Sequence, residues 1–233
     1  EDTNLSASGK MDVEAVATAA IPAMVQLNGT TTVKSSSYFG YGQSYEATSS
    51  GTGIIVGKSD TELLIVTNAH VVDNIDNLKC VFSDGTSASC SVKGSKSDQD
   101  IAVAAVSLSD ISSDTASNIA IAELEDSSDI KVGQQVVAIG NALGEGQSVT
   151  TGIISAKDRS ITVNNVTFTG LLMTDAAINS GNSGGALLNS EGKVIAINFA
   201  KTSSDGVEGM DYSIPVSNDK DINESLMTKQ KTN

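Results

Sequence analysis

The chain has 233 residues, of which 39% are hydrophobic, 18% charged and only 3% aromatic, and its formal net charge is −14. This length can bury a substantial core as one large all-β unit or two small ones, and a composition rich in Val, Ile, Thr and Gly favours short strands over long helices. No Lys/Arg cluster could neutralise a run of phosphates, so no nucleic-acid partner is expected.

The N-terminal segment is polar and lacks periodicity over 1–11, which predicts a disordered arm. It opens on Glu1 rather than on a signal peptide, as expected of a chain that was either processed or cut from a longer protein, so that an upstream export signal or membrane anchor is missing from it. Asp12 is the predicted N-cap of a short helix over 12–20 that ends before Pro22. No stretch approaches the roughly 20 apolar residues that cross a bilayer.

The next predicted elements are a first strand at 23–27 and a long surface loop over 32–50, rich in Ser, Tyr and Gly. From Gly51 onward, apolar segments alternate with turn signals at the even spacing typical of antiparallel barrels or a sandwich. The predicted strands lie at 53–56, 63–68, 78–82, 88–93, 101–106, 136–139, 148–154, 161–163, 171–174, 186–188, 194–200 and 210–214. A Ser/Asp-rich connector over 107–117 divides them into two sets, and 219–227 is a predicted terminal helix.

The two cysteines, Cys80 and Cys90, flank a turn signal at 83–86. A two-residue hairpin loop places Cys80 opposite Ser89, whereas we expect a three-residue loop or a bulge at Gly85 to place it opposite Cys90. A cross-strand disulfide in an oxidising compartment and two free thiols both remain open. The chain lacks a second cysteine pair at zinc-like spacing, so neither a metal nor a cofactor is expected.

His70 is the one histidine of the chain, so histidine-dependent acid–base chemistry has a single possible centre. Alone it would more often be a surface or core residue than a base, and its interpretation depends on further motifs. Asp100 stands directly before the apolar segment 101–103, at the rim of the core, where a partly buried carboxylate can orient a histidine Nδ1–H. Asp98 fits a solvated turn better.

Ser183 lies among three glycines in the motif Asn-Ser-Gly-Asn-Ser-Gly-Gly over 179–185, directly before an apolar segment. A serine nucleophile needs an exposed Oγ on a sharp turn, with backbone N–H groups free to face an oxyanion, and glycine permits such a backbone. The order His70, Asp100, Ser183 is that of the chymotrypsin arrangement and differs from the subtilisin and α/β-hydrolase orders.

Four sequence blocks resemble the protease domain of the HtrA (Deg) family of trypsin-like serine proteases: 67–72, 100–103, 139–144 and 174–185. The resemblance runs from about Val13 to Val216. It implies an all-β fold of the chymotrypsin/trypsin type, a double six-stranded antiparallel β-barrel with short N- and C-terminal helices. The N-terminal barrel is then expected at 12–110, the C-terminal barrel at 111–216, and a tail or linker at 217–233.

The resemblance also implies roles for individual residues. His70 is similar to the general base, Asp100 to its orienting carboxylate and Ser183 to the nucleophile of the family. The oxyanion hole is expected from the backbone N–H groups of Gly181 and Ser183, with that of Asn182 nearby. The residues that match the S1 pocket are Ile178, Ala200, Lys201 and Thr202. Because neither Ala177 nor Ile178 is acidic, we expect a small or medium aliphatic P1 residue.

The resemblance extends to regulation and assembly. The segment 157–167 corresponds to a sensor loop, in which Arg159 is either a relay residue or an ordinary surface arginine. Polypeptide substrates, an extracytoplasmic location and a homotrimer formed through the N-terminal segment are the family's usual properties. The 17 residues after Val216 are too few for the PDZ domain that usually follows, so a PDZ domain, like an anchor, is expected to be absent from this chain.

These observations predict a serine endopeptidase that cleaves unfolded or exposed polypeptides in protein quality control. The alternative is a chaperone-like or peptide-binding module with a resting or inactive protease site. A non-catalytic β-sandwich adhesin would explain the acidity and the Ser/Thr content, but it leaves the motif blocks to coincidence.

Overall fold

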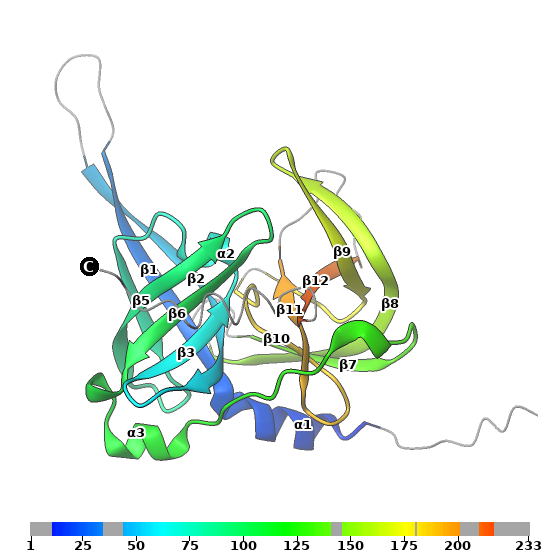
Figure 1. The fold of residues 1–233 in the computed structure, drawn as a ribbon, viewed down its shortest axis with the longest axis horizontal. Helices are drawn as coiled ribbons and strands as arrows, with labels where there is room; N and C mark the ends of the chain where they lie inside the picture. The colour runs from blue at the N-terminus through cyan, green and yellow to red at the C-terminus, as the bar shows by residue number, and fades with distance from the viewer. Residues whose placement is uncertain (1–10, 35–43, 141–145, 180, 201–209, 217–233) are drawn as a thin grey trace, which may run out of the picture.

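The computed structural model describes residues 11–34, 44–140, 146–179, 181–200 and 210–216. Within these ranges, twelve strands form two closed antiparallel barrels of six strands each, which lie side by side in Figure 1. The all-β double barrel predicted from the sequence is therefore confirmed. The expected terminal helix over 219–227 lies outside the described residues.

The first barrel has the strand order β1–β2–β3–β6–β5–β4 and closes where β4 pairs with β1. Its strands are β1 (Met24–Lys34), β2 (Ser44–Lys58), β3 (Glu62–Thr67), β4 (Asn77–Val81), β5 (Ser87–Lys96) and β6 (Ile101–Ser107). A one-turn helix, α2 (Ala69–Val72), directly follows β3. The interior is filled by buried aliphatic side chains such as Leu27, Ile55 and Ile65, so the barrel is a packed core and not a channel.

The second barrel has the strand order β10–β11–β12–β9–β8–β7 and closes where β10 pairs with β7. Its strands are β7 (Gln135–Gly140), β8 (Ser148–Val163), β9 (Val166–Thr174), β10 (Ala186–Leu188), β11 (Val194–Phe199) and β12 (Asp211–Pro215). The turn between β8 and β9 places Asn164 and Asn165 at φ 50° and 64°, the left-handed pair that tight hairpins favour and asparagine tolerates. The two strands predicted at 148–154 and 161–163 are one strand, bent by irregular pairing with β9 between Ile154 and Ile161.

The N-terminal helix α1 (Val13–Ala20) begins as predicted, because Asp12 Oδ1 accepts a hydrogen bond from Ala15 N at 3.0 Å. It continues into a 3-10 turn, η1 (Ile21–Ala23). Met11, at the end of the predicted disordered arm, is 6% exposed and packs with α1 in a cluster that includes Val137 of β7, so the arm was predicted one residue too long. The helix precedes the first barrel yet covers the second as well, and it runs below both in Figure 1.

The connector between the barrels contains more structure than predicted. It holds η2 (Leu108–Asp110), α3 (Ser113–Asn118) and η3 (Ser127–Asp129). Ser112 caps α3 by accepting a hydrogen bond from Thr115 N at 3.1 Å, which explains why this Ser/Asp-rich segment forms a helix without an apolar period.

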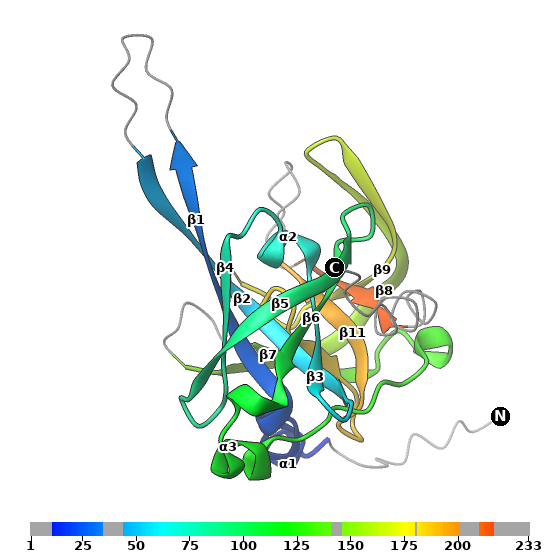
Figure 2. The same cartoon turned by 60° about the vertical axis from the view of Figure 1, so that its left-hand side comes forward.

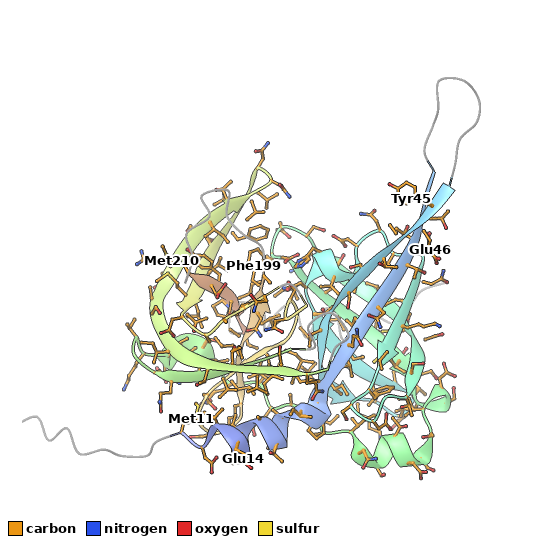
Figure 3. All side chains as sticks on the ribbon, turned by 180° about the vertical axis from the view of Figure 1, so that it is seen from behind. Met11, Glu14, Tyr45, Glu46, Phe199 and Met210 are labelled. Atoms are coloured by element: carbon orange, nitrogen blue, oxygen red, sulfur yellow. The ribbon has the colours of Figure 1, made fainter. Side chains whose placement is uncertain are left out.

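The predicted surface loop over 32–50 is wrong at both ends, and its middle part, 35–43, lies outside the described residues. β1 and β2 pair as far as Lys34 and Ser44, and Figure 2 shows this hairpin extending beyond the first barrel. None of the side chains over 30–32 and 45–50 is buried, and Tyr45 and Glu46 lie on the extension in Figure 3. With both faces of the ribbon in solvent, the sequence shows no alternation of apolar and polar residues there.

The two cysteines do not face one another. Phe82 N donates to Thr86 O at 2.9 Å, which closes a three-residue loop over 83–85 and places Cys80 opposite Ala88 rather than opposite Cys90. The expected pairing with a three-residue loop was therefore wrong, and both thiols are free. Burial raises the pKa of Cys80 well above 9.0 and raises the pKa of Cys90 to about 12.

Candidate active site

The imidazole of His70 and the carboxylate of Asp100 are in direct contact. His70 lies on α2 just after β3, and Asp100 lies just before β6, which pairs with β3 so that Thr67 is opposite Ala102. The Nδ1 atom of His70 is 2.7 Å from Asp100 Oδ2, and the backbone N–H of the same histidine donates to Oδ1 at 3.0 Å. A carboxylate only accepts hydrogen bonds, so Nδ1 carries the proton and Nε2 is left as the free ring acceptor.

Asp100 is held in an unusual backbone conformation by Asn68. Its φ of 55° is left-handed, a conformation that aspartate tolerates better than most residues, and its side chain is buried. The side-chain Nδ2 of Asn68 donates to Asp100 O at 3.0 Å, whereas Asn68 Oδ1 is buried with no partner among the described residues. An unpaired buried acceptor costs about 1–3 kcal/mol.

The aromatic ring of Phe199 covers one side of His70. Phe199 lies at the end of β11 on the side of the second barrel that faces the first (Figure 3), and its ring meets the imidazole edge-on at a centroid distance of 6.4 Å. A second ring, Phe168, packs on Phe199 at 5.0 Å. The imidazole is thereby held between a carboxylate and an apolar wall, with 28% of its side chain exposed.

The turn that carries Ser183 is bound to the first barrel. Thr52 N donates to Ser183 O at 2.8 Å, and Thr52 Oγ1 donates to Gly181 O at 2.7 Å. At Gly184 the φ of 82° is left-handed, and a Cβ there would collide with Thr52 O and Thr67 Oγ1. Glycine is therefore required for the turn to lie this close to the segment that leads into His70.

Ser183 has its side chain between the two barrels. Its Oγ accepts a hydrogen bond from Ala200 N at 3.3 Å, and within the described ranges no hydrogen bond joins it to His70. The structure thus brings His70 and Asp100 into contact and places Ser183 beside them, on a turn bonded to the same barrel.

The backbone of the same turn corrects one expectation for the oxyanion hole. Asn182 N–H donates to Asn179 O at 2.9 Å, so it does not face a ligand. Over the part of the chain that the structure describes, the N–H groups of Gly181 and Ser183 donate to no backbone carbonyl outside the strands. Asn182 instead makes a side-chain contact, in which its Oδ1 accepts a hydrogen bond from Ser148 Oγ at 2.8 Å.

Two of the predicted S1 residues lie together, and two lie outside the described residues. Ile178 and Ala200 pack in one apolar cluster of the second barrel, whereas the structure does not describe Lys201 and Thr202. Ile178 N donates to the carboxylate of Asp211 at 3.0 Å, and burial raises the pKa of that carboxyl group despite the opposing effect of this hydrogen bond.

Arg159 lies on β8 with its side chain exposed and with Leu171 of β9 opposite it. The segment 157–167, predicted as a loop, is mostly the end of the β8–β9 hairpin.

Among the described residues, no three His, Cys, Asp or Glu side chains gather in a way that could hold a metal ion. The described helices include none long and apolar enough to span a bilayer.

The sequence analysis predicted no role in the site for four residues that lie around it: Asn68, Phe199, Asp211 and Ser148. Asn68 and Phe199 belong to apolar segments and were interpreted as parts of strands. Asp211 and Ser148 act on turns far away in sequence, at Ile178 and Asn182. Of these four residues, only Asn68 had a local sequence signal of a role in the site, because it lies inside the motif block over 67–72.

Comparisons with known proteins identify the class of domain. Residues 51–197 match the family model described as a trypsin-like peptidase domain. The serine protease Do-like HtrA of Bacillus subtilis is 38% identical over 217 residues, which cover 89% of this chain and 47% of that protein. The periplasmic serine endoprotease DegP of Salmonella typhimurium is 38% identical over 188 residues, which cover 80% of this chain and 37% of that protein.

A solved structure of the HtrA-type protease AlgW with tripeptide superposes with a TM-score of 0.74 at 31% identity, covering 93% of this chain and 64% of that one. This chain spans about half or less of the length of the curated relatives named above. With a matched trypsin-like peptidase domain, 38% identity to a protein named HtrA and a fold that superposes on an HtrA-type protease, the chain belongs to the HtrA family of trypsin-like serine proteases.

Proposed function

We propose that the chain hydrolyses peptide bonds of unfolded or exposed polypeptides by an acyl-enzyme mechanism with Ser183 as nucleophile, His70 as base and Asp100 as its orienting group. The observation that carries the proposal is the 2.7 Å contact between His70 Nδ1 and Asp100 Oδ2 beside the Ser183 turn. The relatives named as HtrA and DegP proteases support the same reaction class.

In the first step, Ser183 Oγ attacks the peptide carbonyl carbon while its proton passes to His70 Nε2. The Asp100 carboxylate stabilises the imidazolium that forms and keeps the ring oriented. Ser183 Oγ accepts from Ala200 N before substrate binds, so attack requires it to turn toward Nε2. Catalytic hydrogen bonds often tighten in this way only when substrate is present.

The oxygen of the tetrahedral intermediate then carries a negative charge. The N–H groups of Gly181 and Ser183 are separated by Asn182 on the same turn and supply fixed dipoles for that charge. His70 returns its proton to the leaving amine, the C–N bond breaks and the acyl group stays on Ser183 as an ester. Water, deprotonated by His70, hydrolyses the ester and restores the serine.

Substrate choice follows from the walls of the S1 pocket. Ile178 and Ala200 are apolar and pack together, which favours a small or medium aliphatic P1 residue. The name of the periplasmic relative supports an extracytoplasmic location. A role in protein quality control is a further part of this proposal. A homotrimer formed through the N-terminal segment and a relay through Arg159 are further parts of this proposal.

Replacing Ser183 with alanine tests the proposal. The Ser183→Ala variant should lose cleavage of denatured casein by at least about 10³-fold, because the acyl-enzyme cannot form. Ser89→Ala is the matched control, since Ser89 is an exposed serine on β5 of the first barrel. Casein cleavage by Ser183→Ala at the wild-type rate would refute the assignment.

A further inference from the structure

Asn182 lies between Gly181 and Ser183, the two residues whose N–H groups are proposed to bind the oxyanion. We propose that Ser148 is a positioning residue that holds Asn182, and through it the N–H group of Ser183, in the orientation that stabilises the transition state. The inference rests on the proposed function and adds a residue to it that comes from a different strand.

The peptide planes on either side of Asn182 are fixed by the backbone. Because a trans peptide is planar, each N–H points opposite to the C=O of the same plane. Gly181 O accepts from Thr52 Oγ1 at 2.7 Å, and Asn182 N–H donates to Asn179 O at 2.9 Å, which holds the first plane at both ends. In the second plane Asn182 O accepts from Gly185 N at 2.9 Å, and this sets the direction of Ser183 N–H.

The side chain of Asn182 fixes the residue between those planes. It is 1% exposed and packs on the backbone of Gly140, where an added Cβ would lie 2.5 Å from Asn182 Oδ1 and 2.6 Å from its Cα. Ser148 is opposite Gly140 in the pairing of β8 with β7, and its hydroxyl donates to Asn182 Oδ1 at 2.8 Å. Gly140 O, at 3.4 Å, is the weaker of the two acceptors near this hydroxyl.

The need for a hydroxyl at position 148 follows from burial. A buried amide oxygen that loses its donor is driven to find another partner, and rotation of Asn182 would disturb both planes. Since the second plane holds the Ser183 N–H, which acts only on the charged intermediate, the disturbance should lower kcat and leave substrate binding in the ground state unchanged.

A serine-to-alanine substitution at position 148 tests this inference against two further variants. Ser148→Thr keeps the hydroxyl and should restore activity. Thr151→Ala removes a hydroxyl from the same strand that donates to Val136 O at 3.0 Å, away from the turn, and serves as the control. Circular dichroism checks that each variant is folded.

In the Ser148→Ala variant, kcat and the affinity for a peptide aldehyde inhibitor should fall together. Ser148→Ala should lower kcat on a peptide amide with leucine at P1 by about tenfold with KM unchanged, and should weaken inhibition by the matching peptide aldehyde by the same factor. The aldehyde carbon bonds to Ser183 Oγ, and the hemiacetal oxygen occupies the oxyanion position. Ser148→Cys, with a weak thiol donor, should fall between alanine and wild type.

The outcomes separate this inference from the function on which it rests. Wild-type kcat and aldehyde affinity in Ser148→Ala would overturn the role of Ser148 and leave the proposed function standing. So would a loss that threonine does not restore, or an equal loss in Thr151→Ala. A wild-type protein that the aldehyde does not inhibit would overturn the proposed function itself, and the role of Ser148 with it.

Discussion

Replacing Asp100 with asparagine changes one atom of the site and should nearly abolish activity. The carboxylate accepts from two donors of the same residue, His70 N at 3.0 Å and His70 Nδ1 at 2.7 Å. Asparagine has only one acceptor atom. If it keeps the backbone N–H, its NH2 group faces Nδ1 and selects the tautomer that carries hydrogen on Nε2. That tautomer cannot take the proton of Ser183.

The size of the effect follows from the tautomer. A base in the wrong protonation state leaves the binding contacts and the oxyanion donors in place, so KM should stay near wild type while kcat falls about 10⁴-fold. The assay is steady-state cleavage of a peptide amide with leucine at P1. Asp98→Asn is the control, because Asp98 is exposed and only two residues upstream. An Asp100→Asn enzyme that keeps more than about a tenth of kcat, or an equal loss in Asp98→Asn, would refute the reasoning.

Three further changes have definite expected outcomes. Asn68→Ala removes the donor that anchors the Asp100 carbonyl, so kcat should fall at least about tenfold at unchanged KM. A variant with the wild-type kcat and pH–rate profile would contradict this. Cys90 should react with iodoacetamide at pH 8 about 1000-fold more slowly in the native protein than in guanidinium. The reason is that a pKa of about 12 instead of 9.0 reduces the thiolate fraction by that factor. Rapid labelling of the native protein, or no labelling after denaturation, would contradict this. Asp211→Asn should stabilise the protein at pH 7 and not at pH 3. The raised pKa means that this carboxyl stabilises the fold below its unfolded pKa near 3.8 and loses that contribution as the pH rises through its folded value. Urea unfolding at both pH values measures the difference, and a variant no more stable than wild type at pH 7 would count against it.

The parts of the fold that were predictable are those where local pattern and burial agree. The segments at 63–68, 101–106 and 186–188 are short, apolar and bounded by turn signals, and they lie within two residues of β3, β6 and β10. The extension of β1 and β2 could not be found in this way, because its strands expose both faces and carry no period-2 signal.

The site residues that could be predicted are likewise those with a local sequence signal. His70, Asp100 and Ser183 stand in motifs whose residue types have a direct chemical meaning, so sequence spacing was enough to select them. Ser148 and Asp211 act through contacts with turns far away in the chain, and such contacts depend on how strands pair in the closed barrel. The cysteine pairing failed for a related reason, since a shift of the hairpin loop by one residue changes the partner of every residue in the strand.

The most direct test of the account is to locate the residue that a fluorophosphonate probe modifies. The serine that shares a proton with the one imidazole of the chain should be the nucleophile, so peptide mass mapping should find a single phosphonyl group on Ser183. Labelling should slow by at least about 10²-fold in His70→Ala. An adduct on another serine, or equal labelling rates with and without His70, would contradict the central claim.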